Sequence, residues 1–203
     1  MSATRIRLSP ESRREQLLDL GVTLLSGRRL EDLSIDVLAD EAGISRGLLY
    51  HYFAGKREFH LAVLRRMADQ VVAITAPPSD GDPLSQLVTS LAAYLDFVTE
   101  NRVAYVSFVR AAAAGDEEFR RIYEEARGAL TDRIFDHAGR DVLAGLGLVD
   151  GPELRLLVRG WSAMVEDTVL SWLDDDRGIA RDALLEMVAA TLVGVAGVVK
   201  PTR

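Results

Sequence analysis

The sequence predicts an all-α protein of about nine helices. Apolar residues recur at spacings of three and four through most of the chain, which is the period of an amphipathic helix. The alternation of apolar and polar residues that marks a half-buried strand is not found in the sequence. Capping residues, prolines and glycines separate the helical runs, so the chain divides into a small N-terminal unit and a larger C-terminal one.

The first helix is predicted to begin at Ser9-Pro10-Glu11, where a capping serine precedes a proline at the first helical position. Gly27 should end it. We interpret this helix as a scaffold for the segment that follows. Its packing face is formed by Leu17, Gly21, Leu24 and Leu25.

The stretch 33–53 is predicted to hold two short helices joined by a tight turn. Ser34 and Ser45 are good N-caps, because a serine hydroxyl can accept a hydrogen bond from an unpaired backbone N–H of the first turn. Gly43 lies where the first helix should end with a positive φ, which a side chain would resist. Leu49 and Phe53, four residues apart, should anchor the second helix to the first. This is a helix-turn-helix, which places its second helix in the DNA major groove; an ordinary helical hairpin is the alternative.

The motif continues past the turn, and from about Leu17 to Val63 it resembles the signature of the tetracycline-repressor (TetR) family of bacterial regulators. The resemblance implies a helix-turn-helix DNA-binding domain of three helices over residues 1–57, with its motif at about 33–52. It further implies a connecting helix over 58–75 and an effector-binding and dimerisation domain over 82–203. The residues that carry the resemblance are Ala39, Ala42, Gly43, Ser45, Gly47, Tyr50, Phe53 and Lys56.

The recognition helix is predicted to span Ser45 to Tyr52. Arg46 is the best candidate to contact a base edge, since a guanidinium can bond guanine bidentately, and Leu48 can contact a thymine methyl. By the resemblance, Ser34 and Lys56 should hold phosphates; for Lys56 a plain surface lysine is the alternative. The other outward residues divide between bases and phosphates in a way that the sequence leaves open: Gly47, Tyr50, His51 and Tyr52.

Downstream, the connecting helix must end before Pro77, and the segment 76–83, rich in Pro, Gly, Ser and Asp, is the one clear boundary. Residues 139–151 are glycine-rich. We interpret them as a connector, because a phosphate-binding loop would follow a strand and here a helix precedes. Further helices are expected over about 83–100, 103–114, 116–134, 153–173 and 180–199.

Several aromatic side chains in these helices combine an apolar face with a hydroxyl group. In the TetR family the equivalent helices enclose a pocket for a small, largely apolar ligand, and a filled core is the alternative. The candidate pocket residues are Tyr94, Tyr105, Phe108, Tyr123, Trp161 and Glu166.

The last two helices are apolar on more than one face, so more than one face must be covered. The chain offers too few other helices for this, which favours pairing with a second copy in a four-helix interface. The candidate interface residues are Leu157, Trp161, Trp172, Leu184, Val188, Leu192 and Val193.

Composition sets limits. The formal net charge is −7, with +1 in residues 1–57 and −8 in the remainder, so charge neither supports nor excludes DNA binding. Without cysteine there are no disulfides or thiolate ligands, and the Asp174–Asp176 run lacks the alternating ligands of a calcium loop, so no metal is expected. No signal peptide and no apolar run long enough to span a bilayer are present, which predicts a cytoplasmic protein without a membrane partner.

No enzyme and no cofactor are expected. The three histidines form no zinc-binding pattern, and the nucleophile elbow, the P-loop and the dinucleotide fingerprint are missing from the sequence. A purely structural helical oligomer would explain the C-terminal helices but would leave Tyr50, His51 and Lys56 without purpose. We therefore expect a homodimeric repressor on palindromic double-stranded operator DNA, released by a small-molecule effector. An activator, or a regulator without small-molecule control, is the alternative.

Overall fold

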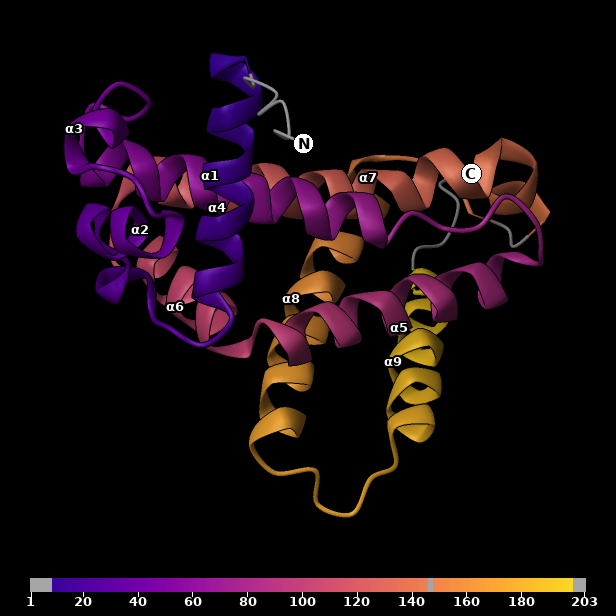
Figure 1. Ribbon diagram of the computed structural model, residues 1–203. Coiled ribbons are helices and arrows are strands. Elements are labelled where there is room, and N and C mark those ends of the chain that lie inside the picture. The colour runs from indigo at the N-terminus through magenta and orange to yellow at the C-terminus, as the bar shows by residue number, and fades with distance from the viewer. Residues whose placement is uncertain (1–8, 146–147, 199–203) are drawn as a thin grey trace, which may run out of the picture. The chain divides into compact units, whose positions relative to one another are not determined.

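The computed structural model describes residues 9–145 and 148–198, without the side chains of residues 137–145. These residues form nine α-helices, one 3₁₀-helix and no strand, which confirms the predicted all-α class (Figure 1). The elements are α1 (Pro10–Leu25), η1 (Leu30–Asp32), α2 (Ile35–Ala42), α3 (Arg46–Leu49), α4 (Lys56–Ile74), α5 (Pro83–Glu100), α6 (Arg102–Ala113), α7 (Glu117–Gly145), α8 (Pro152–Asp174) and α9 (Arg181–Ala196).

The described chain forms two compact units. The first unit has two segments, the chain up to Asp69 and Asn101–Ile122. It therefore contains α1 to α3, most of α4, all of α6 and the start of α7. The second comprises Gln70–Glu100 and the chain from Tyr123 onward. The sequence had suggested a division near residues 57 and 82, with α6 in the C-terminal part. The grouping of α6 with the first unit follows from its packing on η1, where Leu30 N donates to Ser107 Oγ at 3.0 Å.

Helix α1 begins as the sequence predicts, because Ser9 Oγ accepts from Ser12 N at 3.1 Å and Pro10 occupies the first helical position. It ends at Leu25, two residues before Gly27. Gly21 lets α1 approach α4 closely: a Cβ there would lie 2.7 Å from Val63 Cγ2. The core of the first unit therefore depends on a missing side chain as well as on buried ones.

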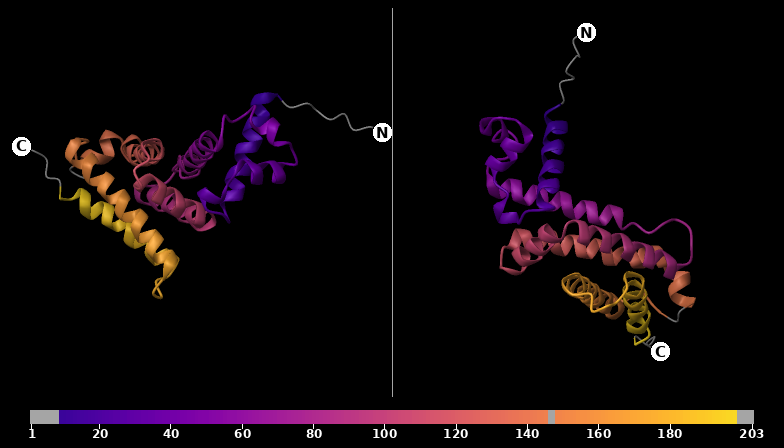
Figure 2. Two further views of the ribbon diagram at one scale, coloured as in Figure 1. Left: turned by 90° about the vertical axis from the view of Figure 1, so that its left-hand side faces the viewer. Right: turned by 60° about the horizontal axis from the view of Figure 1, so that its bottom comes forward.

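In the second unit, α9 packs against both α5 and α8; α8 and α9 lie side by side, and α5 crosses them (Figure 1 and Figure 2). Trp161 on α8 is buried, and its Nε1 donates to Val188 O at 3.2 Å and to Thr191 Oγ1 at 3.0 Å on α9. Arg181 at the start of α9 forms an ion pair of 2.7 Å with Asp96 on α5. The core of this unit includes Leu91, Leu95, Val98, Leu154, Val158, Val165, Leu184 and Leu185.

Helix α7 is longer than the sequence suggested. It continues to Gly145 through the first half of the glycine-rich segment 139–151, which we had interpreted as a connector. Residues 140–144 contain neither proline nor glycine, and the single Gly139 costs only about 1 kcal/mol in a helix, which does not by itself end one. Across the described chain, no helix is long and apolar enough to cross a membrane.

Candidate functional site

The helix-turn-helix in the first unit is fixed by the capping residues that the sequence identifies. Ser34 Oγ accepts from Val37 N at 3.1 Å and Ser45 Oγ from Leu48 N at 3.2 Å, so both helices begin with a side-chain cap. Gly43 ends α2 with φ of +63°, and Ile44 N returns to Ala39 O at 3.1 Å. This is the αL termination that favours glycine and sets the angle between the two helices.

The recognition helix is shorter than predicted. Regular α-helix covers Arg46–Leu49, and the chain then tightens, with His51 N donating to Leu48 O at 3.2 Å and Tyr52 N to Leu49 O at 2.9 Å. These three-residue bonds satisfy the end of a short helix without extending it. Residues 50–52 therefore form a tight turn that continues from α3 to Phe53.

Burial separates this segment into an anchoring side and an outward side. Leu49 and Phe53 are fully buried, and the Phe53 ring lies 5.1 Å from that of Phe59 on α4. By contrast, 57% of Tyr50 and 38% of Leu48 are exposed. Arg46, Gly47 and His51 are exposed as well, and Tyr52 is half-buried. Five of the six predicted recognition residues of this segment are therefore open to solvent.

Helix α4 holds the chain that leads into α2. Lys56 Nζ donates to Glu31 O at 2.8 Å, and one helical turn later His60 Nε2 lies 2.6 Å from Leu33 O. Burial lowers the pKa of His60, so the neutral ring with its proton on Nε2 is the form that donates to this carbonyl. Lys56 and His60 therefore position the start of the helix-turn-helix. The motif alone does not reveal this role of His60, although its spacing of four from Lys56 places both on one side of α4.

Six arginines of this unit are paired with carboxylates of the same unit. A DNA-binding surface usually presents free cations, so this pairing lowers its general attraction for phosphates. Among the described residues the pairs are Arg14–Glu58 at 3.7 Å, Arg28–Glu41 at 3.1 Å, Arg29–Asp32 at 2.9 Å, Arg46–Asp36 at 2.6 Å, Arg57–Asp116 at 2.6 Å and Arg66–Asp19 at 2.8 Å.

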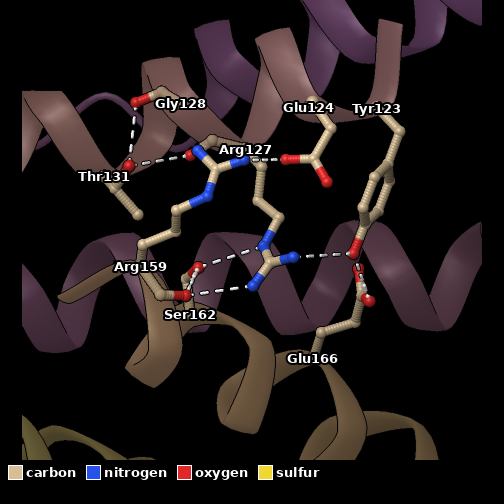
Figure 3. Close-up of polar contacts among 8 residues, drawn as sticks. All are labelled: Tyr123, Glu124, Arg127, Gly128, Thr131, Arg159, Ser162 and Glu166. Carbon is tan, nitrogen blue, oxygen red and sulfur yellow. Dashed lines mark hydrogen bonds and ion pairs between the residues drawn. The ribbon is translucent and has the colours of Figure 1, made fainter. Parts of the chain in front are cut away.

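A polar network in the second unit joins α7 to α8 (Figure 3). Tyr123 OH donates to Glu166 Oε1 at 2.7 Å. Arg127 Nη1 lies 3.5 Å from the Tyr123 hydroxyl, and its Nε donates to Ser162 Oγ at 3.2 Å. Burial and the Glu166 carboxylate raise the pKa of Tyr123, so its phenol keeps its proton and remains a donor. Beside this network Arg159 forms an ion pair with Glu124.

Two family models match this chain. Residues 17–63 match "bacterial regulatory proteins, tetR family", and residues 83–194 match "tetracyclin repressor-like, C-terminal domain". Together they cover both the helix-turn-helix and most of the downstream helices. The chain belongs to the TetR family. It is therefore a DNA-binding transcriptional regulator by family, as the resemblance in the motif had predicted.

Individual relatives agree with this assignment. The transcriptional activator FasR from Mycolicibacterium smegmatis is 30% identical over 182 residues, which cover 89% of this chain and 81% of FasR. A TetR-family regulator from Streptomyces coelicolor has a crystal structure that matches with a TM-score of 0.79 at 31% identity, covering 94% of this chain and 83% of that one. The regulator FadR from Bacillus subtilis, in complex with stearoyl-CoA, shares the fold with a TM-score of 0.69 at 16% identity, covering 89% and 98%.

The six candidate pocket residues of this TetR-family protein do not all lie in one unit. Tyr94 and Trp161 are buried in the second unit, which also contains the hydrogen-bonded Tyr123 and Glu166. The other two, Tyr105 and Phe108, are buried on α6 in the first unit. Arg127 and Ser162 were not among the candidates, although a spacing of four places Arg127 beside Tyr123 and Ser162 beside Glu166.

Three of the seven candidate interface residues do not fit the expected interface with a second copy. Trp161, Leu184 and Val188 are buried within a single chain, so their side chains offer no surface to a second copy. Leu192 is partly buried against a cluster of Phe135, Leu154 and Val158. Trp172 is half-buried and donates to Ile179 O at 2.9 Å. Only Leu157 and Val193 are exposed among the seven, at 36% and 58%. Apolar side chains exposed near them, which the sequence analysis missed, are Leu156, Met164 and Met187.

Proposed function

We propose that this chain is a homodimeric repressor that binds palindromic double-stranded operator DNA in the cytoplasm and is released by a small, largely apolar effector. The observation that carries the proposal is the doubly capped helix-turn-helix, whose outward side is exposed, in a chain of a DNA-binding family. A two-fold DNA site calls for a two-fold protein, because each chain brings one recognition helix.

Purified full-length protein should shift a palindromic duplex from its own upstream region, with an affinity that falls steeply as the salt concentration rises. Arg46 is assigned to a base edge and Leu48 to a thymine methyl. Ser34 and Lys56 are assigned to phosphates, and Tyr50, His51 and Tyr52 to the remaining bases and phosphates. If a genomic selection recovers no duplex that binds, the operator part of the proposal is wrong.

The two kinds of contact predict different mutant behaviour. Arg46→Ala should relax preference at one base position in each half-site and cost about 1–3 kcal/mol of operator binding. Lys56→Ala removes a cation that also donates to Glu31 O, and it should weaken all sequences about equally and reduce the salt slope by about one. Binding selections on randomised half-sites measure the first effect, and salt titrations measure the second. If the two variants behave identically, the assignment of Arg46 to a base and Lys56 to a phosphate is wrong.

For the effector, we assign the network of Tyr123, Arg127 and Glu166 to the polar end of the site, with apolar residues of the second unit such as Tyr94 around the remainder. The support is chemical: donors and a carboxylate meet on α7 and α8, inside a unit whose core is largely apolar. An effector with one polar group and an apolar body would then exchange hydrogen bonds with this network.

Effector and operator should weaken each other by the same factor. A coupling of 1–3 kcal/mol corresponds to a change in affinity of roughly 5–150-fold, and thermodynamic linkage makes the change reciprocal. Calorimetry with an effector found by thermal-shift screening, in the presence and absence of operator duplex, measures it. Tyr123→Phe should lower effector affinity while leaving operator affinity unchanged. Equal effector affinities in the two titrations would contradict release by an effector, and the protein would then be a regulator without small-molecule control.

Activation is a second candidate, because the relative FasR, which aligns with most of this chain, is a transcriptional activator. The two functions differ in the direction of a simple measurement. Deletion of the gene should raise the transcript level downstream of the bound duplex for a repressor and lower it for an activator.

A further inference from the structure

Arg46 and Asp36 form an ion pair between the two helices of the helix-turn-helix. Arg46 Nε lies 2.6 Å from Asp36 Oδ1, and 66% and 51% of the two side chains are exposed. Asp36 belongs to the first turn of α2, and Arg46 is the first residue of α3. The pair therefore links the supporting helix to the side chain that we assign to base recognition.

The atoms in this contact matter for recognition. A guanidinium can bond guanine end-on, with its terminal Nη1 and Nη2 groups aimed at O6 and N7. Asp36 engages Nε, on the other edge of the group, so a guanidinium held in this way can still direct its two terminal nitrogens outward. Holding one edge also restricts the rotamers of the exposed Arg46 side chain before DNA binds. Less conformational entropy is then lost on binding.

The same carboxylate affects contacts with the DNA backbone. A cation attracts every phosphate regardless of sequence, and this attraction dominates non-specific binding. Asp36 compensates the charge of Arg46 at short range, so the pair as a whole attracts a phosphate less than a free arginine would. Hydrogen bonds to a neutral guanine edge, by contrast, depend more on the direction of the donor groups than on their net charge. The pair should therefore disfavour phosphate contacts more than guanine contacts.

We propose that Asp36 is a positioning residue for base recognition: it holds Arg46 ready for a guanine edge and suppresses its binding to phosphates of any sequence. This inference rests on the proposed role of Arg46 as a base contact. A purely structural role for Asp36, as an acid near the positive end of the α2 dipole, predicts a change in stability alone.

The test compares Asp36→Ala with Asp40→Ala, which removes an equal charge one turn later on the same helix. Full-length protein is titrated with operator duplex and with a scrambled duplex of equal length, at several salt concentrations. An exposed ion pair contributes 0.2–1 kcal/mol, so Asp36→Ala should bind the scrambled duplex about 1.4–5-fold tighter. Its salt slope there should steepen by about 0.9, and the ratio of operator to scrambled affinity should fall. Asp40→Ala should show clearly smaller changes.

Arg46→Ala and the double variant with Asp36→Ala complete a double-mutant cycle. If Asp36 acts through Arg46, the effect of Asp36→Ala on the scrambled duplex should vanish in the Arg46→Ala background. Asp36→Asn, which removes the charge but keeps the size of the side chain, repeats the comparison if the alanine variant folds poorly.

Equal behaviour of Asp36→Ala and Asp40→Ala would overturn the inference, and so would an effect that persists without Arg46. A separate outcome identifies a failure of the underlying assignment. If Arg46→Ala relaxes no base position at all, then Arg46 is not a base contact and the function assigned to it is wrong.

Discussion

Replacing Phe53 by alanine should unfold the DNA-binding unit and abolish operator binding. The Phe53 side chain is 1% exposed, and its ring packs against Phe59 and lies 5.0 Å from the Arg14 guanidinium. Truncating a buried phenylalanine costs about 3–5 kcal/mol, because apolar contact is lost and a cavity remains. Proteins of this size are stable by only about 5–15 kcal/mol in total, so the loss is a large share of what a small unit has.

The placement of the tryptophans makes this loss measurable unit by unit. Both Trp161 and Trp172 lie on α8 in the second unit, so tryptophan fluorescence follows that unit while circular dichroism follows all helices. In urea, Phe53→Ala should bring part of the dichroism transition to lower concentration and leave the fluorescence transition less affected.

Tyr50→Ala is the matched control for Phe53→Ala, since Tyr50 lies three residues earlier and is 57% exposed. It should change the free energy of unfolding by no more than about 0.5 kcal/mol, as surface substitutions usually do, and still weaken DNA binding. If Tyr50→Ala destabilises the chain as much as Phe53→Ala, the outward side of the recognition segment has been assigned wrongly.

Local capping chemistry explains why the helix-turn-helix could be predicted residue by residue. Ser34, Gly43 and Ser45 act on bonds within a few positions, and each makes the contact or adopts the backbone conformation that its chemistry favours. The position at which the recognition helix ends is not marked by such local signals. Glycine, proline and capping residues are missing at positions 50–52, so no local signal marks the tight turn that leads to the buried Phe53.

Contacts between distant segments were beyond prediction from the sequence. The hydrogen bond from Leu30 to Ser107 crosses 77 positions, and it groups α6 with the first unit where spacing alone suggested the C-terminal domain. The periodicity of α6 shows that Tyr105 and Phe108 are buried but not on which partner. For the same reason, only the structure separates candidate interface residues from core residues of α8 and α9.

The exposed residues of α8 and α9 therefore define the proposed dimer interface more narrowly. Gly160 and Gly194 have open space where a Cβ would be, so a second copy could approach the backbone closely at both. Leu157 and Met164 flank Gly160 at helical spacing, and Val193 adjoins Gly194. Apolar and small side chains on an exposed face are typical of surfaces that pack against another helix pair.

Placing a carboxylate at Val193 should break the dimer and with it operator binding. Val193 is 58% exposed in the single chain, so Val193→Glu should leave the fold intact. In a two-fold interface the substitution occurs twice, and an uncompensated buried charge costs about 3–5 kcal/mol. One such charge alone should weaken dimerisation by a factor of roughly 100 to several thousand, and two should weaken it further, giving monomer at micromolar concentration in analytical ultracentrifugation. A monomer brings one recognition helix, so it should shift the palindrome only at much higher concentration.

Val103→Glu on α6 is the matched control, because Val103 is 41% exposed and the added charge is equal. It should remain dimeric and lose only the small part of DNA affinity that one extra negative charge removes. Leu192→Glu is a poorer test, since Leu192 packs against the cluster of Phe135, Leu154 and Val158 and its loss would disturb the fold itself. If Val193→Glu stays dimeric and binds operator as Val103→Glu does, the two copies must meet elsewhere, and the exposed apolar residues of α8 and α9 need another partner.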